Sequence, residues 1–182
     1  RNLTCGAHLA AEAFQQGGVA IEELDKADIA TVPFDALAAD YDAAFTESCI
    51  GTRMRRAVHR RLLARFRPSS SGARGDRILE LNCGTGEDAV FLARRGLDVL
   101  ATDLSSEMVE QTRAKVRQAG LEARIEVRAM AIEELPRLAG SGTFAGALSN
   151  FGGLNCVADL GAVARSLAGA LRPGAFAMLC VM

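Results

Sequence analysis

A loop containing two glycines, placed between an apolar run and a helical pattern, is the first feature of the sequence that could bind a ligand. The run Arg77–Leu81 leads into Asn82-Cys83-Gly84-Thr85-Gly86, and the helical pattern starts at once. Glycine allows a sharp turn and a close approach of the backbone to a ligand, and the free N–H groups of a helix start attract an anionic group. The alternative is a purely structural turn, because many strand-to-helix connections contain two glycines.

An acid at the end of the next apolar run narrows the choice of ligand. This run ends at Asp103, where the chain leaves the predicted sheet beside the glycine loop. A carboxylate at that point can accept hydrogen bonds from the hydroxyls of a ribose. Alone, Asp103 could merely cap the helix that follows. Together, the loop and the acid predict a nucleoside-containing ligand.

Glu80 separates two kinds of nucleoside ligand. Its carboxylate, next to the loop, would repel the pyrophosphate of a nicotinamide dinucleotide but suits a ligand that carries an ammonium group. Asn82 adds a second polar side chain facing the same space. An NAD(P)-dependent oxidoreductase domain therefore stays as an alternative, with Glu80 as the observation against it.

The elements that must position these residues alternate between short apolar runs and helical periods. Such alternation predicts an α/β fold with a doubly wound, Rossmann-like parallel sheet and helices on both faces. The predicted strands are 77–81, 98–103, 125–129, 144–149 and 175–181, and the predicted helices are 86–95, 105–119 and 160–171.

Upstream of this core, the pattern predicts a helical cap. Apolar residues from Phe34 to Phe45 follow one face of a helix, and those from Met54 to Phe66 follow a second. The turn-rich stretch Pro68–Gly72 is typical of a linker. We therefore divide the chain into an arm or lid (1–33), a helical cap with its linker (34–72) and a ligand-binding core (73–182).

Charge and composition disfavour several classes of function. The chain has 182 residues, with 21 Lys+Arg against 22 Asp+Glu, so no global field favours nucleic acid or acidic lipid. Seven arginines from Arg53 to Arg67 are interpreted as a solvated helix face, and His59 among them has no recognisable catalytic or metal-binding neighbour. No run is long enough to span a membrane. Five scattered cysteines without a metal-ligand pattern predict reduced thiols, no metal site and a cytoplasmic location.

Two stretches of the core resemble the class I methyltransferases that use S-adenosylmethionine. The first motif of that family is similar to Ile78–Gly86, and its second motif is similar to Val99–Met108. The resemblance implies S-adenosyl-L-methionine as the cofactor and Asp103 as the acid that binds its ribose. It also implies that Leu104 and Met108 lie against the adenine, although Met108 could equally be a core residue.

The resemblance extends to further site residues. Met130 stands where the family often has an aspartate, which leaves the adenine to backbone groups of Met130 and Ala131 or to a nearby acid such as Glu133. Ser149 and Asn150, followed by Phe151, match the loop beside the reactive sulfonium. Tyr41, in the predicted cap, resembles a tyrosine that closes on the methionine moiety; the alternative is a tyrosine that only completes a helix.

The activity implied by the resemblance is methyl transfer to an acceptor, with a small molecule preferred over RNA or protein. Direct in-line displacement needs chiefly proximity and orientation, so we assign no catalytic residue. A non-catalytic binding or scaffold protein is the other alternative. The sequence stops at Met182, before the helix and antiparallel strand pair that usually end the family's seven-stranded sheet. We therefore expect a free edge at the fifth strand, covered by further residues of the protein or by another chain, such as a second copy.

Overall fold

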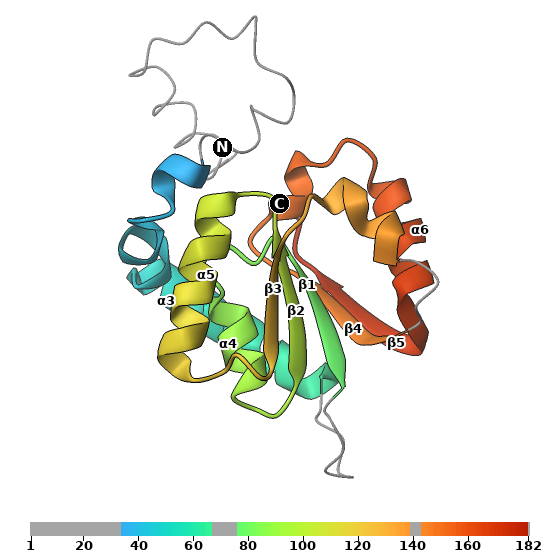
Figure 1. Ribbon diagram of the computed structural model, residues 1–182, viewed down its shortest axis with the longest axis horizontal. Helices are drawn as coiled ribbons and strands as arrows, with labels where there is room; N and C mark the ends of the chain where they lie inside the picture. Colours follow the sequence, from blue (N-terminus) through green and yellow to red (C-terminus); the bar gives the residue numbers. More distant parts are fainter. Residues whose placement is uncertain (1–33, 67–75, 139–142, 182) are drawn as a thin grey trace, which may run out of the picture.

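A five-stranded, fully parallel sheet forms the centre of the molecule (Figure 1). The computed structural model describes residues 34–66, 76–138 and 143–181. The strand order is β3-β2-β1-β4-β5, so the chain reverses its direction of winding beside β1, as in doubly wound folds. The strands are β1 (Arg77–Leu81), β2 (Asp98–Asp103), β3 (Ile125–Ala129), β4 (Phe144–Ser149) and β5 (Leu171–Leu179).

Helices cover both faces of this sheet, as predicted (Figure 1). One face packs against α3 (Cys49–Arg65), α4 (Glu87–Ala93) and α5 (Ser106–Ala119), and its core includes Leu62, Val99 and Val116. The other face packs against α6 (Leu160–Ala170) and the 3₁₀ turn η3 (Ile132–Leu138), with Leu100 and Leu167 in its core. Neighbouring strand residues point to opposite faces, which explains why continuous apolar runs fill both cores.

The helix boundaries follow the side-chain chemistry at their first residues. Ser48, Ser105 and Asp159 each accept a hydrogen bond from the backbone N–H three residues later, at the start of α3, α5 and α6. Such N-caps satisfy donors that have no partner inside the helix. The helix predicted from residue 105 therefore begins one residue later, with Ser105 as its cap.

The predicted helix from Phe34 to Phe45 is wrong as one continuous element. Helical turns end at Leu37, and after a break the chain forms a short π-helix, η2 (Asp42–Thr46). Of the predicted apolar face, Ala38 is buried, whereas Phe34 is 39% exposed. The polar partners of Asp42, described below, hold this segment in a path that a regular helix would not follow. We call residues 34–48 the cap segment.

The fifth strand also differs from its prediction. It starts at Leu171 instead of Ala175, because Leu171 pairs with Phe144 before a register shift interrupts the ladder. This strand forms one edge of the described sheet, and Phe176 on it is 48% exposed. The predicted free edge is therefore observed among the described residues, but nothing in the structure tests the predicted partner chain.

Some predictions lie outside the described residues, namely the arm or lid over 1–33 and the linker at Pro68–Gly72. Among the residues that are described, no helix has the length and apolar character needed to cross a bilayer. Within the same ranges, no three His, Cys, Asp or Glu side chains are grouped closely enough to hold a metal ion.

Candidate functional site

The glycine loop and Asp103 meet at the carboxyl ends of β1 and β2, as predicted. The Gly84 N–H donates to Asp103 Oδ2 at 2.8 Å, and the Ser105 N–H donates to Asp103 Oδ1 at 3.0 Å. Burial raises the pKa of Asp103, although these backbone donors act in the opposite direction. Asp103 does not cap α5, because Ser105 fills that position. Its carboxylate is instead fixed against the loop, where it can face a ligand.

Glu80 lies at the end of β1 and is only 2% exposed. Its Oε2 atom has no hydrogen-bond partner among the described residues. Burial, together with the negative charge of Asp88, raises the pKa of Glu80 well above its ordinary value. A buried carboxyl oxygen without a partner is costly, so Glu80 marks a place where a donor from a ligand would be stabilising.

Asn82 joins the loop after β1 to the loop after β4. Its Nδ2 donates to the Asn150 carbonyl at 2.8 Å, and its Oδ1 accepts from the Ser149 hydroxyl at 2.6 Å. Asn82 has a φ of 48°, in the left-handed region that asparagine tolerates better than most residues. The predicted site residues of β1 and β4 are therefore brought together, with Asn82 as their connection.

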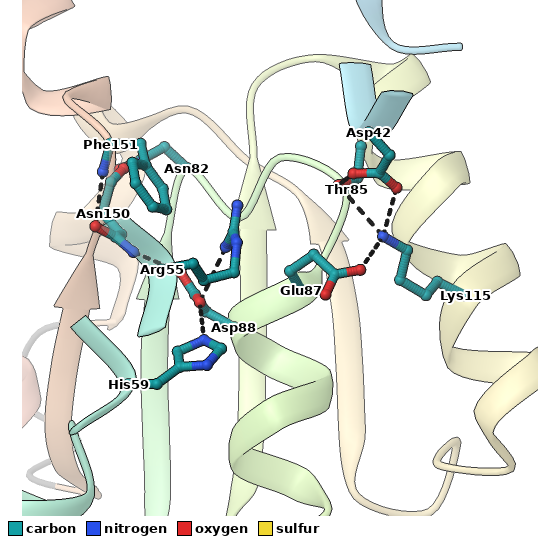
Figure 2. Close-up of polar contacts among 10 residues, drawn as sticks. All are labelled: Asp42, Arg55, His59, Asn82, Thr85, Glu87, Asp88, Lys115, Asn150 and Phe151. Carbon is teal, nitrogen blue, oxygen red and sulfur yellow. Dashed lines mark hydrogen bonds and ion pairs between the residues drawn. The ribbon is translucent and has the colours of Figure 1, made fainter. Parts of the chain in front are cut away.

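The hydroxyl of Thr85 joins the glycine loop to the cap segment, while the predicted cofactor contact of Thr85 stays a prediction (Figure 2). Its hydroxyl donates to Asp42 Oδ1 at 2.6 Å, and Lys115 Nζ donates to Asp42 Oδ2 at the same distance and to Glu87. Burial alone would raise the pKa of Asp42, but the hydrogen bonds from Lys115 and Thr85 outweigh it and lower that pKa. These four residues form a latch that holds the cap segment against the glycine loop.

Three aromatic rings connect the cap segment with the loop after β4. The Tyr41 and Phe45 rings lie 5.7 Å apart, and the Phe45 and Phe151 rings meet edge to face at 5.3 Å. We call this group the aromatic wall. Burial raises the pKa of Tyr41, and the charge of Arg55 opposes the shift. The structure thus places Tyr41 near charged groups of the site, and its predicted contact with the methionine moiety of a cofactor stays a prediction.

A buried carboxylate that the sequence analysis missed organises one side of the site (Figure 2). Asp88, 2% exposed on α4, accepts from Arg55 at 3.0 Å and from His59 Nε2 at 2.6 Å through Oδ1, and from Asn150 Nδ2 at 2.8 Å through Oδ2. Although burial raises the pKa of Asp88, the His59 hydrogen bond and the Arg55 charge outweigh it and lower that pKa.

Two earlier interpretations are corrected by this cluster. His59 does have a carboxylate neighbour, and its ring also stacks on Phe91 with centroids 3.5 Å apart. Arg55 does not belong to the solvated arginine face, because its side chain is 12% exposed and lies over the Phe151 ring. A signal was present in the sequence, since Arg55 and His59 are spaced i, i+4 on one helix and therefore share a face.

The residues predicted to contact adenine divide into two groups. Leu104 is 40% exposed beside Asp103, whereas Met108 and Met130 are 2% and 7% exposed, and Met130 belongs to the core beneath α6. The Met130 N–H already donates to the Asp103 carbonyl, and the Ala131 N–H donates to Glu134 rather than facing Glu133. Both N–H groups thus have internal partners in this structure, and recognition of adenine by backbone groups of Met130 and Ala131 or by a nearby acid stays a prediction.

Comparison with known proteins agrees with this geometry. A family model described as a methyltransferase domain matches residues 78–174, which is more than half of the chain. The chain belongs to this methyltransferase family. Its matched region contains both the glycine loop and Asp103, so the resemblance to class I S-adenosylmethionine-dependent methyltransferases is confirmed. The Rossmann-like fold class is confirmed as well, with five described strands in place of the usual seven.

Individual relatives of this methyltransferase domain match about half of the chain. A phosphatidylethanolamine N-methyltransferase of Cereibacter sphaeroides is 35% identical over 95 residues, 52% of this chain and 41% of that protein. An uncharacterized protein of Mycobacterium tuberculosis is 37% identical over 100 residues, 53% of this chain and 35% of that protein. The chain thus matches less than half the length of these relatives.

A solved structure shows the same fold. It is that of a putative S-adenosyl-L-methionine-dependent methyltransferase from Methanococcus maripaludis, which superimposes with a TM-score of 0.59 at 17% identity. The match covers 87% of this chain and 65% of the other. This match is longer than the region of residues 78–174 matched by the family model.

Proposed function

We propose that this methyltransferase domain binds S-adenosylmethionine at the glycine loop and transfers its methyl group to a small-molecule acceptor by direct in-line displacement. The observation that carries the proposal is a pair of buried polar atoms without partners among the described residues, Glu80 Oε2 and Arg55 Nε. Glu80 Oε2 is an acceptor and Arg55 Nε is a cationic donor. The two residues lie close enough for the charge of Arg55 to act on the Glu80 carboxyl group. A zwitterionic amino-acid group complements both.

The proposed binding roles follow from these positions. Glu80 receives the ammonium group of the cofactor and Arg55 its carboxylate, because each offers the opposite charge in a buried setting. Asp103, held by the Gly84 and Ser105 N–H groups, accepts hydrogen bonds from the ribose hydroxyls. The exposed side chain of Leu104 packs against the adenine. The reactive chemistry belongs to the cofactor, whose sulfonium makes the methyl group open to attack by a nucleophile.

A small, partly apolar acceptor fits the aromatic wall better than a polymer does. Tyr41, Phe45 and Phe151 are each half-buried, and two of them belong to the cap segment that the latch holds in place. Aromatic rings supply large apolar contact surface with few rotatable bonds. The protein therefore contributes mainly orientation and the exclusion of water, and a general base is required only if the acceptor must lose a proton.

The proposal is tested by titrating the protein with S-adenosylhomocysteine in a calorimeter, with NADH as the comparison ligand. Asp103→Ala removes a charged acceptor and is expected to cost about 1.5–3 kcal/mol, or roughly ten- to a hundredfold in affinity. Asp98→Ala, at the opposite end of β2, is the matched control and should bind as the wild type does.

Transfer of labelled methyl groups to a panel of small aromatic and aliphatic acceptors tests the second half of the proposal. Preference for NADH would favour the oxidoreductase alternative. Binding of S-adenosylhomocysteine without transfer to any acceptor would favour a non-catalytic domain. Loss of affinity in both aspartate variants would show that Asp103 has no special role.

A further inference from the structure

Asp88 is a buried carboxylate to which the proposed function assigns no role. It lies in the first turn of α4, directly before the apolar sequence Ala89–Ala93, and its side chain is almost fully buried. An ionised carboxylate in such a place is expensive unless hydrogen bonds compensate it. Here three donors from two other elements converge on it, which indicates a site built around this residue and not an accident of packing.

The partners of Asp88 come from the two elements that flank the cofactor loop. Arg55 and His59 lie on α3, and Asn150 follows β4. Asn150 in turn accepts from the Phe151 N–H at 2.9 Å through its Oδ1. Phe151 has a φ of 54°, which is an unfavourable conformation for an aromatic residue. Asp88 thus fixes the amide that supports this strained backbone.

The geometry of Arg55 shows what the cluster achieves. Asp88 holds one guanidinium nitrogen, the Phe151 ring lies 4.6 Å from Cζ, and Nε stays buried without a partner among the described residues. A guanidinium can bind carboxylates at more than one edge. With one edge occupied by Asp88, the remaining donors are held in one orientation toward the site.

We propose that Asp88 is a positioning residue, which orients Arg55 and Asn150 so that Arg55 presents its free donors to the carboxylate of the bound amino-acid group. The proposal rests on the proposed function, since it assigns a role to residues around that cofactor. It differs from a general structural role because it predicts an effect on one part of the ligand only. The adenosine half of the ligand, at Asp103 and Leu104, should not depend on Asp88.

Two ligands separate the halves of the site. S-adenosylhomocysteine carries the amino-acid group, and 5′-methylthioadenosine lacks it while keeping the nucleoside and the sulfur. For Asp88→Asn we expect affinity for S-adenosylhomocysteine to fall about ten- to a hundredfold, with affinity for 5′-methylthioadenosine unchanged within about twofold. Arg55→Met should show the same selective loss, and the double variant should bind no more weakly than Arg55→Met alone, because residues that act as one unit are not additive.

The control variant is Glu110→Gln, which removes an exposed carboxylate of α5 that, among the described residues, forms an ion pair with Arg113. It should leave both affinities unchanged. Equal losses for both ligands in Asp88→Asn, or additive losses in the double variant, would overturn the positioning role. If the wild type binds neither ligand, the proposed function fails; if it binds both and Asp88→Asn shows no selectivity, only the present inference fails.

A measurement on the wild type covers the case in which Asp88→Asn does not fold. Nitrogen NMR of the guanidinium groups, with Arg55 assigned from its absence in Arg55→Lys, reports whether rotation about the terminal bonds is hindered. A guanidinium held by Asp88 should give separate terminal-nitrogen signals in the free protein, and its Nε signal should shift with S-adenosylhomocysteine but not with 5′-methylthioadenosine. One averaged terminal signal, or equal shifts with both ligands, would contradict the proposal.

Discussion

Gly86 gives the sharpest quantitative test of how the loop is built. It precedes α4 with a φ of 81°, and a Cβ added there would lie 2.6 Å from Thr112 Cγ2 and 2.9 Å from Thr112 Oγ1. Gly86→Ala therefore has two costs. The left-handed backbone costs an L-residue about 1–2 kcal/mol, and the collision with a fully buried threonine costs about 1–3 kcal/mol more. The expected loss of unfolding free energy is about 2–5 kcal/mol.

Gly120 provides the matched control for this substitution. It also has a positive φ, of 65°, but an added Cβ would meet nothing within 4 Å. Gly120→Ala should therefore show only the backbone cost, about 1–2 kcal/mol, because the loss of unfolded-state entropy is the same for both alanines. The difference between the two variants, measured by urea denaturation, isolates the contact with Thr112.

A third variant tests the assignment of that difference. Thr112→Ser removes the Cγ2 atom and keeps the hydroxyl that donates to the Gly84 carbonyl at 2.7 Å. Gly86→Ala should be less destabilising in this background than in the wild type. Equal costs for Gly86→Ala and Gly120→Ala, or no relief from Thr112→Ser, would refute the close approach of α5 to the loop as the reason for glycine at this position.

Three further predictions concern charge, the latch and the sheet edge. Burial raises the pKa of Glu80 in the free protein, and a ligand ammonium group would lower it again, so binding of S-adenosylhomocysteine should release a proton. Calorimetry in buffers of different ionisation enthalpy checks this release. Wild-type binding enthalpies that do not differ between buffers, or a proton release that persists in Glu80→Gln, would contradict the prediction. The pKa of Asp42 is lowered in the folded protein. The ionised Asp42 carboxylate therefore stabilises docking of the cap segment fully above pH 3.8, its ordinary pKa, and this stabilisation is lost as the pH falls through the lowered pKa. Tyr41 is the only tyrosine and the chain has no tryptophan, so tyrosine fluorescence reports on the cap segment. This fluorescence should change in acid before the far-ultraviolet circular dichroism does, and in Asp42→Asn it should already be changed at neutral pH. Simultaneous acid transitions of the two signals would argue against the latch. Self-association through β5 should weaken in Phe176→Lys when followed by sedimentation, and a wild type that is monomeric at all concentrations would exclude pairing of copies at this edge.

The fold could be predicted from the sequence because local signals and tertiary structure agree there. Strands β1, β2 and β4 are buried on both faces, so their apolar runs are nearly continuous, and Ser105 marks a helix start by its own hydrogen bond. The path of the cap segment could not be predicted from periodicity. It depends on Asp42 meeting Lys115, which is far away in the chain, and no local pattern encodes such a partner.

The site was predicted where a single motif carries it and missed where several elements converge. Glu80, Asp103 and the glycine loop lie within two strand-to-helix connections, so spacing alone brought them together. Asp88 and Arg55 were missed, although Asn150 was predicted from the resemblance, because the contact of these three residues requires the whole sheet to be in place. The i, i+4 spacing of Arg55 and His59 is the local sign of such a cluster, because it places two possible partners of a buried acid on one helix face.

The bond between Asn82 and Asn150 has a consequence for how the domain reaches its working state. It connects loops 68 residues apart in the sequence. In the chain, β4 follows β2 and β3, which lie on the opposite side of β1, so β1 can pair with β4 only after β2 and β3 have been synthesised. Contacts of such long sequence separation are entropically costly to close and form slowly. A growing chain would therefore carry a complete glycine loop well before it had a complete site, and ligand capture would be among the last properties acquired during synthesis.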